Sequence, residues 1–211
     1  MAAMLKVYAD RLSQPSRALI IFCRVNKLDF EEVTVNLGKG QHRTPEFNKI
    51  NPMGQVPVIV DGRFRLFESH AILRYLATVF PGVPDHWYPV DLFTRAKIES
   101  ILDWHHSNLR RGAESAEVSV ANDHVRRGKE QALNGNPQPS IADLSLVCEI
   151  MQLELVGDER RDSILGPREK IGAWMENVKK ATSPHFEEAH ELIFKMKAWL
   201  SADRVKTVSK L

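Results

Sequence analysis

The chain has 211 residues, of which 27% are charged and 43% hydrophobic, and its formal net charge is +2. This composition predicts a soluble globular protein with ample length for a buried core, and the scattering of basic residues among acidic ones argues against a nucleic-acid-binding surface. No apolar run approaches the ~20 residues that span a bilayer, and residues 1–6 lack a signal-peptide core, so we expect neither a membrane span nor secretion.

The first predicted elements are a strand, a turn and a helix. Leu5–Ala9 has the parity of an extended strand, and residues 15–26 have the apolar pattern of a helix. Ser13 lies at the turn between them, and Pro15 suits the first helical turn because its fixed φ is already helical. A hydroxyl beside a helix start can donate to an anion, which the free N–H groups and the macrodipole also favour. The alternative is that Ser13 or Ser16 merely caps the helix.

The remaining elements of the first half combine strands and short helices. Asp61-Gly62 between two short apolar runs is a strong hairpin signal. Residues 81–89 contain three prolines and a glycine and predict a linker. The predicted elements are a strand at 30–37, a short helix from 44, strands at 56–60 and 63–67, and a helix from 68.

The second half is helical in pattern. Apolar residues recur at helical spacing after residue 91, with no strand-like alternation between them. The predicted fold class is therefore α+β: a thioredoxin-like domain at residues 1–82, in the order βαβ-α-ββ-α, is followed by an all-α domain at residues 90–211. The helices expected in the second domain lie at 96–109, 142–155, 171–181 and 186–200.

Two further points on the first domain can meet a ligand near Ser13. If the Val56-Pro57 bond is cis, Val56 turns its backbone N–H and C=O toward the start of the first helix, where they can pair with an extended peptide. Glu68 and Ser69 open another helix, whose N–H groups and hydroxyl suit a carboxylate while the Glu68 carboxylate suits an ammonium. The alternative is an ordinary acidic first turn with a serine cap.

A loop before the short helix supplies donors for a second carboxylate. Gln41, His42 and Arg43 lie there, although a solvated loop histidine is the simpler interpretation of His42. A ligand with an amino-acid end, a peptide backbone with a thiol, and a carboxylate at the far end is glutathione. The arrangement therefore predicts a glutathione site.

At these residues the chain resembles the cytosolic glutathione S-transferases, most closely the theta class and its plant members. The resemblance covers residues 4–112 and 135 to about 200. The motifs that carry it are Ser13-Gln14-Pro15-Ser16-Arg17, Lys39-Gly40-Gln41-His42, Asn51-Pro52-Met53-Gly54-Gln55-Val56-Pro57, Phe67-Glu68-Ser69-His70-Ala71-Ile72, Asp85-His86-Trp87-Tyr88-Pro89 and Ser140-Ile141-Ala142-Asp143-Leu144.

The resemblance implies a serine-type transferase with glutathione as co-substrate and no metal. Ser13 would donate a hydrogen bond to the glutathione sulfur and lower its pKa, so that the thiolate attacks a small hydrophobic electrophile or an organic hydroperoxide. Arg110 would line the electrophile pocket, and a homodimer is expected. The glutathione-binding residues implied by the resemblance are Gln14, Gln41, His42, Gln55, Val56, Pro57, Glu68, Ser69 and Ser107.

The resemblance fails between residues 112 and 136. Theta enzymes place the rest of the fourth helix and a full fifth helix there, whereas residues 113–135 are too few and too polar for both. We therefore expect exposed apolar surface and a weakened dimer. The alternative function that follows is a non-catalytic protein that binds glutathione or a hydrophobic ligand.

Two other features bear on function and location. A thiol-disulfide oxidoreductase is disfavoured because no cysteine lies at the Ser13 turn, and Cys23 and Cys148 sit in apolar helical patterns that predict buried, inert thiols. The chain ends in Ser209-Lys210-Leu211, which matches the tripeptide read by the peroxisomal import receptor. We expect the protein in the peroxisome, in the cytosol, or in both.

Overall fold

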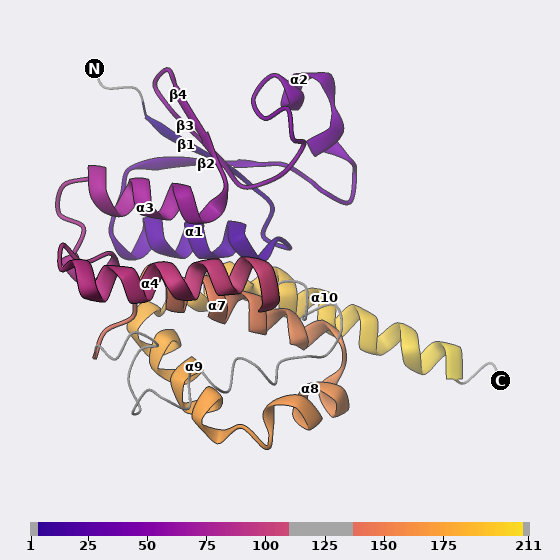
Figure 1. The fold of residues 1–211 in the computed structure, drawn as a ribbon. Helices are drawn as coiled ribbons and strands as arrows, with labels where there is room; N and C mark the ends of the chain where they lie inside the picture. The colour runs from indigo at the N-terminus through magenta and orange to yellow at the C-terminus, as the bar shows by residue number, and fades with distance from the viewer. Residues whose placement is uncertain (1–3, 110–136, 209–211) are drawn as a thin grey trace.

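The computed structural model describes residues 4–109 and 137–208, with side chains described as far as residue 203. Figure 1 shows a sheet at one end, helices α1 and α3 against it, and the helices of the second half packed on the other side of α1 and α3. The elements of the first half are β1 Leu5–Ala9, α1 Gln14–Val25, β2 Phe30–Thr34, η1 Gln41–Arg43, α2 Pro45–Asn48, β3 Val58–Asp61, β4 Phe64–Phe67, α3 Ser69–Val79 and η2 Asp85–Trp87.

The sheet has four strands in the order β2-β1-β3-β4. β1 runs parallel to β2 through the crossover helix α1 and antiparallel to β3, with Val7 opposite Ile59. β3 and β4 form the antiparallel hairpin expected at Asp61-Gly62, where Gly62 has a φ of 58°. The predicted order βαβ-α-ββ-α and the α+β class are thus confirmed.

The second half consists of helices and helical turns in the described residues. Asp91 begins α4 by accepting a hydrogen bond from the Thr94 N–H at 2.7 Å. The elements are α4 Leu92–Trp104, the π-helical turn η3 His105–Leu109, α7 Ile141–Ile150, the 3-10 turn η5 Met151–Leu155, α8 Asp158–Leu165, α9 Glu169–Thr182 and α10 His185–Val208.

Two helices form the centre of the molecule. Residues 15–23 of α1 are all buried, and so is every residue of α7, because α1 lies between the sheet and α7. One continuous core contains side chains from both halves. Trp87 of the expected linker is 1% exposed and packs edge-on against Phe22, with ring centroids 5.4 Å apart. The division at residues 1–82 and 90–211 stays a prediction, since the two regions share this core.

The boundaries of several elements differ from those expected. β2 ends at Thr34 rather than at residue 37, the α-helix expected at 96–109 becomes a π-helical turn at His105, and the one expected at 142–155 ends at Ile150. The polar helix α8 has no apolar period to predict it. Arg110, the shortened segment 113–135 and the tripeptide 209–211 lie outside the described residues. Within the described ranges, no helix is long and apolar enough to cross a membrane.

Candidate active site

The turn between β1 and α1 is fixed by Asp10, which is 6% exposed. Its carbonyl accepts a hydrogen bond from the Ser13 N–H at 2.9 Å. Its carboxylate accepts from the N–H of Leu12 and of Leu37, each at 2.8 Å. One buried carboxylate therefore ties the serine turn to the loop after β2.

Arg17 supports the same turn from below and is fully buried. Its Nη1 donates to the carbonyls of Arg11 and Leu12 at 2.9 and 3.0 Å, and its Nη2 donates to the Cys148 carbonyl at 2.9 Å and to Gln152 Oε1 at 3.0 Å. Burial lowers the pKa of this guanidinium, and four hydrogen bonds compensate the lost hydration. The turn is thereby joined to the end of α7.

The Ser13 hydroxyl is not used to cap α1. Ser13 occupies the N-cap position, with φ −78° and ψ 123°, but its side chain makes no capping hydrogen bond. A capping serine accepts from the second or third helical N–H, and the second position here is Pro15, which has none. The capping alternative therefore does not hold for this hydroxyl, which lines a pocket instead.

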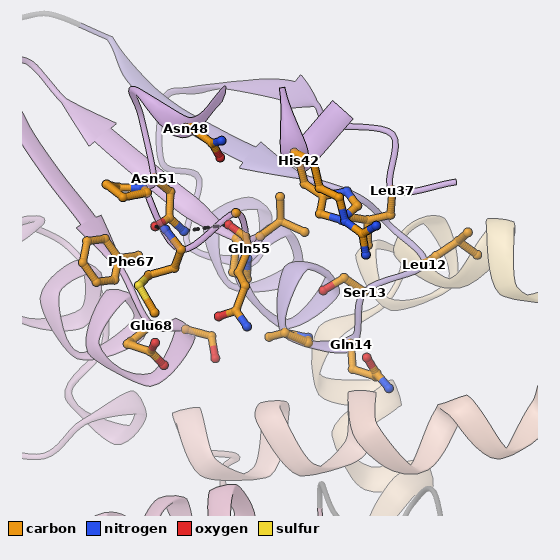
Figure 2. A pocket seen from close by; sticks show the side chains of 18 residues that line it. Leu12, Ser13, Gln14, Leu37, His42, Asn48, Asn51, Gln55, Phe67 and Glu68 are labelled. Carbon is orange, nitrogen blue, oxygen red and sulfur yellow. Dashed lines mark hydrogen bonds between the residues drawn. The ribbon is translucent and has the colours of Figure 1, made fainter. Parts of the chain in front are cut away.

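The pocket has a volume of about 680 Å³, within the range of small-molecule sites. Figure 2 shows Ser13, Gln55 and Glu68 around it, arriving from the start of α1, the approach to β3 and the start of α3. The lining consists of residues 12–15, 37, 42–43, 48, 51–57 and 67–69.

The start of α3 is also left without a side-chain cap. Its N-cap is Glu68, which has a φ of 70° and a side chain that makes no capping hydrogen bond. Ser69 is the first helical residue, so it does not act as the cap that the simpler interpretation assumed. The first N–H groups of α3 lie beside the pocket with the positive end of the helix dipole, which suits a carboxylate.

The approach to β3 is held by Asn51, which is 1% exposed. Its Nδ2 donates to the Gln55 carbonyl at 2.8 Å, drawn as a dashed line in Figure 2, and its Oδ1 accepts from the Met53 N–H at 3.0 Å. The Val56-Pro57 bond is cis, and the strand pairing begins only at the next residue. Val56 therefore lies in the pocket wall ahead of the ladder.

His42 places a donor in the opposite wall. Arg43 Nε donates to His42 Nε2 at 3.1 Å, so the neutral ring carries its proton on Nδ1. That Nδ1 is buried and has no hydrogen-bond partner among the described residues.

Most of the residues expected to bind glutathione line this pocket, although their contact with a ligand stays a prediction. Gln41 lies outside, because its Oε1 accepts from the Asn36 N–H at 2.7 Å. Ser107 also lies outside, and its hydroxyl donates to the Asp103 carbonyl at 2.9 Å. Expected residues in the lining are Ser13, Gln14, His42, Arg43, Gln55, Val56, Pro57, Glu68 and Ser69; lining residues absent from that expectation include Asn48, Asn51 and Phe67.

Neither cysteine can act as a nucleophile here. Cys23 and Cys148 are free and buried, as expected, and burial raises the pKa of each thiol to about 12. Both thiols are therefore protonated at neutral pH and out of reach of a substrate. The described residues also contain no cluster of histidine, cysteine and carboxylate side chains that could hold a metal ion.

Comparisons with known proteins identify the family. The profile of the "Glutathione S-transferase, N-terminal domain" matches residues 3–78. Glutathione S-transferase T1 of Arabidopsis thaliana is 50% identical over 235 aligned positions, which cover 98% of this chain and 96% of the relative. The chain belongs to the glutathione S-transferase family. Because the alignment is longer than the 211-residue chain, the relative has residues with no counterpart here.

The comparisons also identify the class. Glutathione S-transferase T2 of Arabidopsis thaliana is 48% identical over 98% of this chain, which spans 40% of that relative. A solved human theta-class glutathione transferase is 30% identical, with a TM-score of 0.82 and coverage of 96% of this chain and 92% of that one. The protein is a theta-class glutathione transferase, an enzyme whose co-substrate is glutathione.

Proposed function

We propose that Ser13 activates the thiol of glutathione for attack on small hydrophobic electrophiles. The observation that carries this proposal is a serine hydroxyl at a helix start that makes no capping bond and faces a pocket of tripeptide size. A donor that the fold leaves unused beside the positive end of α1 can stabilise a thiolate.

The pocket offers partners for each end of glutathione. The γ-glutamyl carboxylate would accept from Ser69 and the first N–H groups of α3, and the ammonium would pair with Glu68. The backbone of Val56 would pair with the cysteinyl residue. The glycyl carboxylate would accept from His42 Nδ1, which has no other partner among the described residues. With these contacts made, the sulfur would lie beside Ser13.

The Ser13 hydroxyl and the start of α1 can supply the free energy needed to lower the pKa of the glutathione thiol. A free thiol titrates near ~8.5, so lowering its pKa by two units needs roughly 2.7 kcal/mol. A hydrogen bond to a charged group contributes about 1.5–3 kcal/mol and a helix terminus about 0.3–1 kcal/mol. The sulfur then forms a bond to carbon while the leaving group departs with its electron pair. The solved human theta-class relative contains the glutathione conjugate of 1-menaphthyl sulfate, which supports conjugation of this kind.

Reduction of organic hydroperoxides is the second proposed activity. The thiolate attacks a peroxide oxygen and the O–O bond breaks, which gives an alcohol and a glutathione sulfenic acid. A second glutathione thiol then yields the disulfide and water. Parallel assays with cumene hydroperoxide and a benzyl halide would give the ratio of the two activities.

The test is the Ser13→Ala variant. We expect kcat/KM to fall roughly 100-fold, because two pKa units of thiolate stabilisation disappear, while glutathione still binds. Titration of the thiolate absorbance of bound glutathione should show its pKa rising toward ~8.5. Unchanged turnover in Ser13→Ala would contradict the mechanism.

The matched control is Ser16→Ala. Ser16 lies in the same first turn of α1 but is fully buried and outside the pocket lining. This variant should keep the wild-type kcat/KM. A non-catalytic binding protein is the alternative, and it predicts glutathione binding without turnover in the wild type as well as in both variants.

We also propose a homodimer and a second pocket wall beyond the described residues. Arg110 would line the electrophile pocket, and the positions missing relative to the plant relative would fall at 113–135. Val90, Leu92 and Phe93 at the start of α4 are 76, 72 and 84% exposed, which supports coverage by a second copy. In sedimentation experiments the wild type should be a dimer, and Phe93→Glu should dissociate at higher protein concentration than the wild type. A monomeric wild type would contradict the proposal.

For location, we propose import into peroxisomes through Ser209-Lys210-Leu211. A fluorescent fusion at the N-terminus should accumulate in peroxisomes, and deletion of the three residues should return it to the cytosol. A diffuse signal from both fusions would contradict import.

A further inference from the structure

A chain of three polar side chains runs from half-buried His70, the residue after the pocket lining, to two buried side chains of the helical half. His70 Nε2 lies 3.0 Å from His105 Nδ1, with the two ring centroids 5.1 Å apart. His105 Nε2 lies 3.3 Å from Glu149 Oε2, and these two side chains are 4% and 2% exposed. The chain joins α3, η3 and α7, which are far apart in sequence.

The carboxylate sets the direction of these hydrogen bonds. A carboxylate accepts, so His105 donates through Nε2–H to Glu149. When the His105 ring is neutral, its Nδ1 accepts and His70 donates through Nε2–H. Each ring is thus fixed in orientation and tautomer by the next group, and the whole chain is anchored at α7.

His70 lies next to two residues of the pocket lining, Glu68 and Ser69, at the start of α3. His70 directly follows Ser69, and the preceding Glu68 has a φ of 70°, a conformation that non-glycine residues seldom adopt. Such a backbone persists only where surrounding contacts over-determine it. The bond from His70 to His105 ties this first turn of α3 to the interior.

The neighbouring residue on α7 supports the other end of the pocket. The Cys148 carbonyl accepts from Arg17 Nη2 at 2.9 Å, and Arg17 Nη1 holds the carbonyls of Arg11 and Leu12 just before the serine. Consecutive residues 148 and 149 of α7 are therefore connected to the turn before α1 and, through His105 and His70, to the start of α3.

We propose that His105 and Glu149 are positioning residues that hold the start of α3 for the γ-glutamyl end of glutathione. This inference rests on the proposed function, because it concerns the same pocket. Contacts to the γ-glutamyl group are present in the ground state and the transition state alike, so loosening them raises KM for glutathione and leaves kcat unchanged.

The test uses two variants that cut the chain at different points. His70→Ala removes the half-buried first link, and the double variant His105→Leu/Glu149→Leu replaces the buried pair with apolar side chains, which avoids an unpaired buried charge. We expect each to raise KM for glutathione roughly tenfold while kcat stays within about twofold, since tenfold corresponds to the loss of about one hydrogen bond. Equilibrium binding of glutathione should weaken by the same factor.

Two further variants separate positioning from general stability. His105→Gln keeps one acceptor and one donor on a single side chain, so it should restore KM to within about threefold of wild type. Trp174→Phe removes another buried bond to α7, from Trp174 Nε1 to Asp143 Oδ1 at 2.9 Å, and should lower Tm without changing KM.

The outcomes distinguish this inference from the proposed function. A wild-type KM in both chain-cutting variants, or an equal rise in KM in Trp174→Phe, overturns the positioning role even if Ser13→Ala lowers kcat/KM roughly 100-fold as expected. If the wild type fails to bind or turn over glutathione, it is the proposed function that fails. A raised KM with rescue by His105→Gln supports the inference.

Discussion

The helix starts of this protein fall into two kinds. α7 begins with a closed cap in which Ser140 and Asp143 are both fully buried, and the Asp143 carboxylate accepts from the Ser140 N–H at 2.8 Å, from its hydroxyl at 2.6 Å and from Trp174 Nε1 at 2.9 Å. α1 and α3 begin without any capping bond from Ser13 or Glu68, and both open onto the pocket. At α7 the chain satisfies the helix end with its own side chains, whereas at α1 and α3 no side chain caps the end that faces the pocket.

The largest effect is expected from removing the side-chain cap of α7. Asp143→Ala removes the acceptor of three buried donors, so we expect the free energy of unfolding to fall by about 3 kcal/mol. Urea denaturation measures this loss. KM for glutathione should stay at the wild-type value in the folded fraction, because this cap does not touch the pocket. A loss below about 1 kcal/mol would mean that the closed cap is not a stabilising device.

A second test measures how the free energy of unfolding depends on pH through the buried His190. Burial and the nearby Arg17 charge lower the pKa of His190 from 6.5 to about 3, so the folded state keeps this ring neutral. Below pH 6.5 the unfolded chain binds a proton that the folded chain does not, so stability falls as pH drops from about 6.5 toward 3. From pH 7 to 5 this effect is about 2 kcal/mol.

The measurement for this second test is urea denaturation at both pH values. The side chain in His190→Gln cannot titrate. The free energy of unfolding of this variant should therefore fall by about 2 kcal/mol less than that of wild type between pH 7 and 5. Equal losses in the two proteins would show that His190 is not the group responsible. Activity at pH 7 should be unaffected, since His190 lies outside the pocket lining.

A matched pair of serine variants compares the two kinds of start directly. Ser140→Ala should lower the free energy of unfolding by about 1–2 kcal/mol, because a capping hydroxyl is lost. Ser13→Ala should change it by less than about 0.5 kcal/mol, because its hydroxyl caps nothing. Thermal unfolding of both variants tests the contrast, and a similar loss in Ser13→Ala would contradict it.

The smallest expected effect concerns the open start of α3. Ser69→Ala removes one donor for the γ-glutamyl carboxylate, so KM for glutathione should rise about fivefold, equivalent to about 1 kcal/mol. Stability should be unchanged. Steady-state kinetics with varied glutathione measures the effect, and an unaltered KM would remove Ser69 from the proposed contacts.

Local signals in the sequence were enough to predict the strands and the turn at the start of α1. The alternation in Leu5–Ala9, the Asp61-Gly62 turn and the serine-proline start of α1 each depend on neighbours in sequence, and the structure has all three. Two expected ligand contacts instead form local bonds, because backbone groups a few residues away compete for the same polar atoms. The Gln41 amide oxygen accepts from the backbone of its own loop, and the Ser107 hydroxyl donates to the preceding helical turn.

The chain of His70, His105 and Glu149 had no signal in the sequence at all. Its members are separated by 35 and 44 residues, and each alone has the pattern of an ordinary helical side chain. Only the packing of α3, η3 and α7 brings the three together. Arg17 likewise occurs in a recognisable motif, but its bond to the end of α7 follows from burial that no local pattern encodes.

The residues proposed to support the pocket, on α1, η3 and α7, lie on both sides of the interval 110–136 in sequence. Arg17 and His105 precede it, and Cys148 and Glu149 follow it. We therefore expect changes confined to that interval to alter the proposed electrophile specificity more than the proposed binding of glutathione.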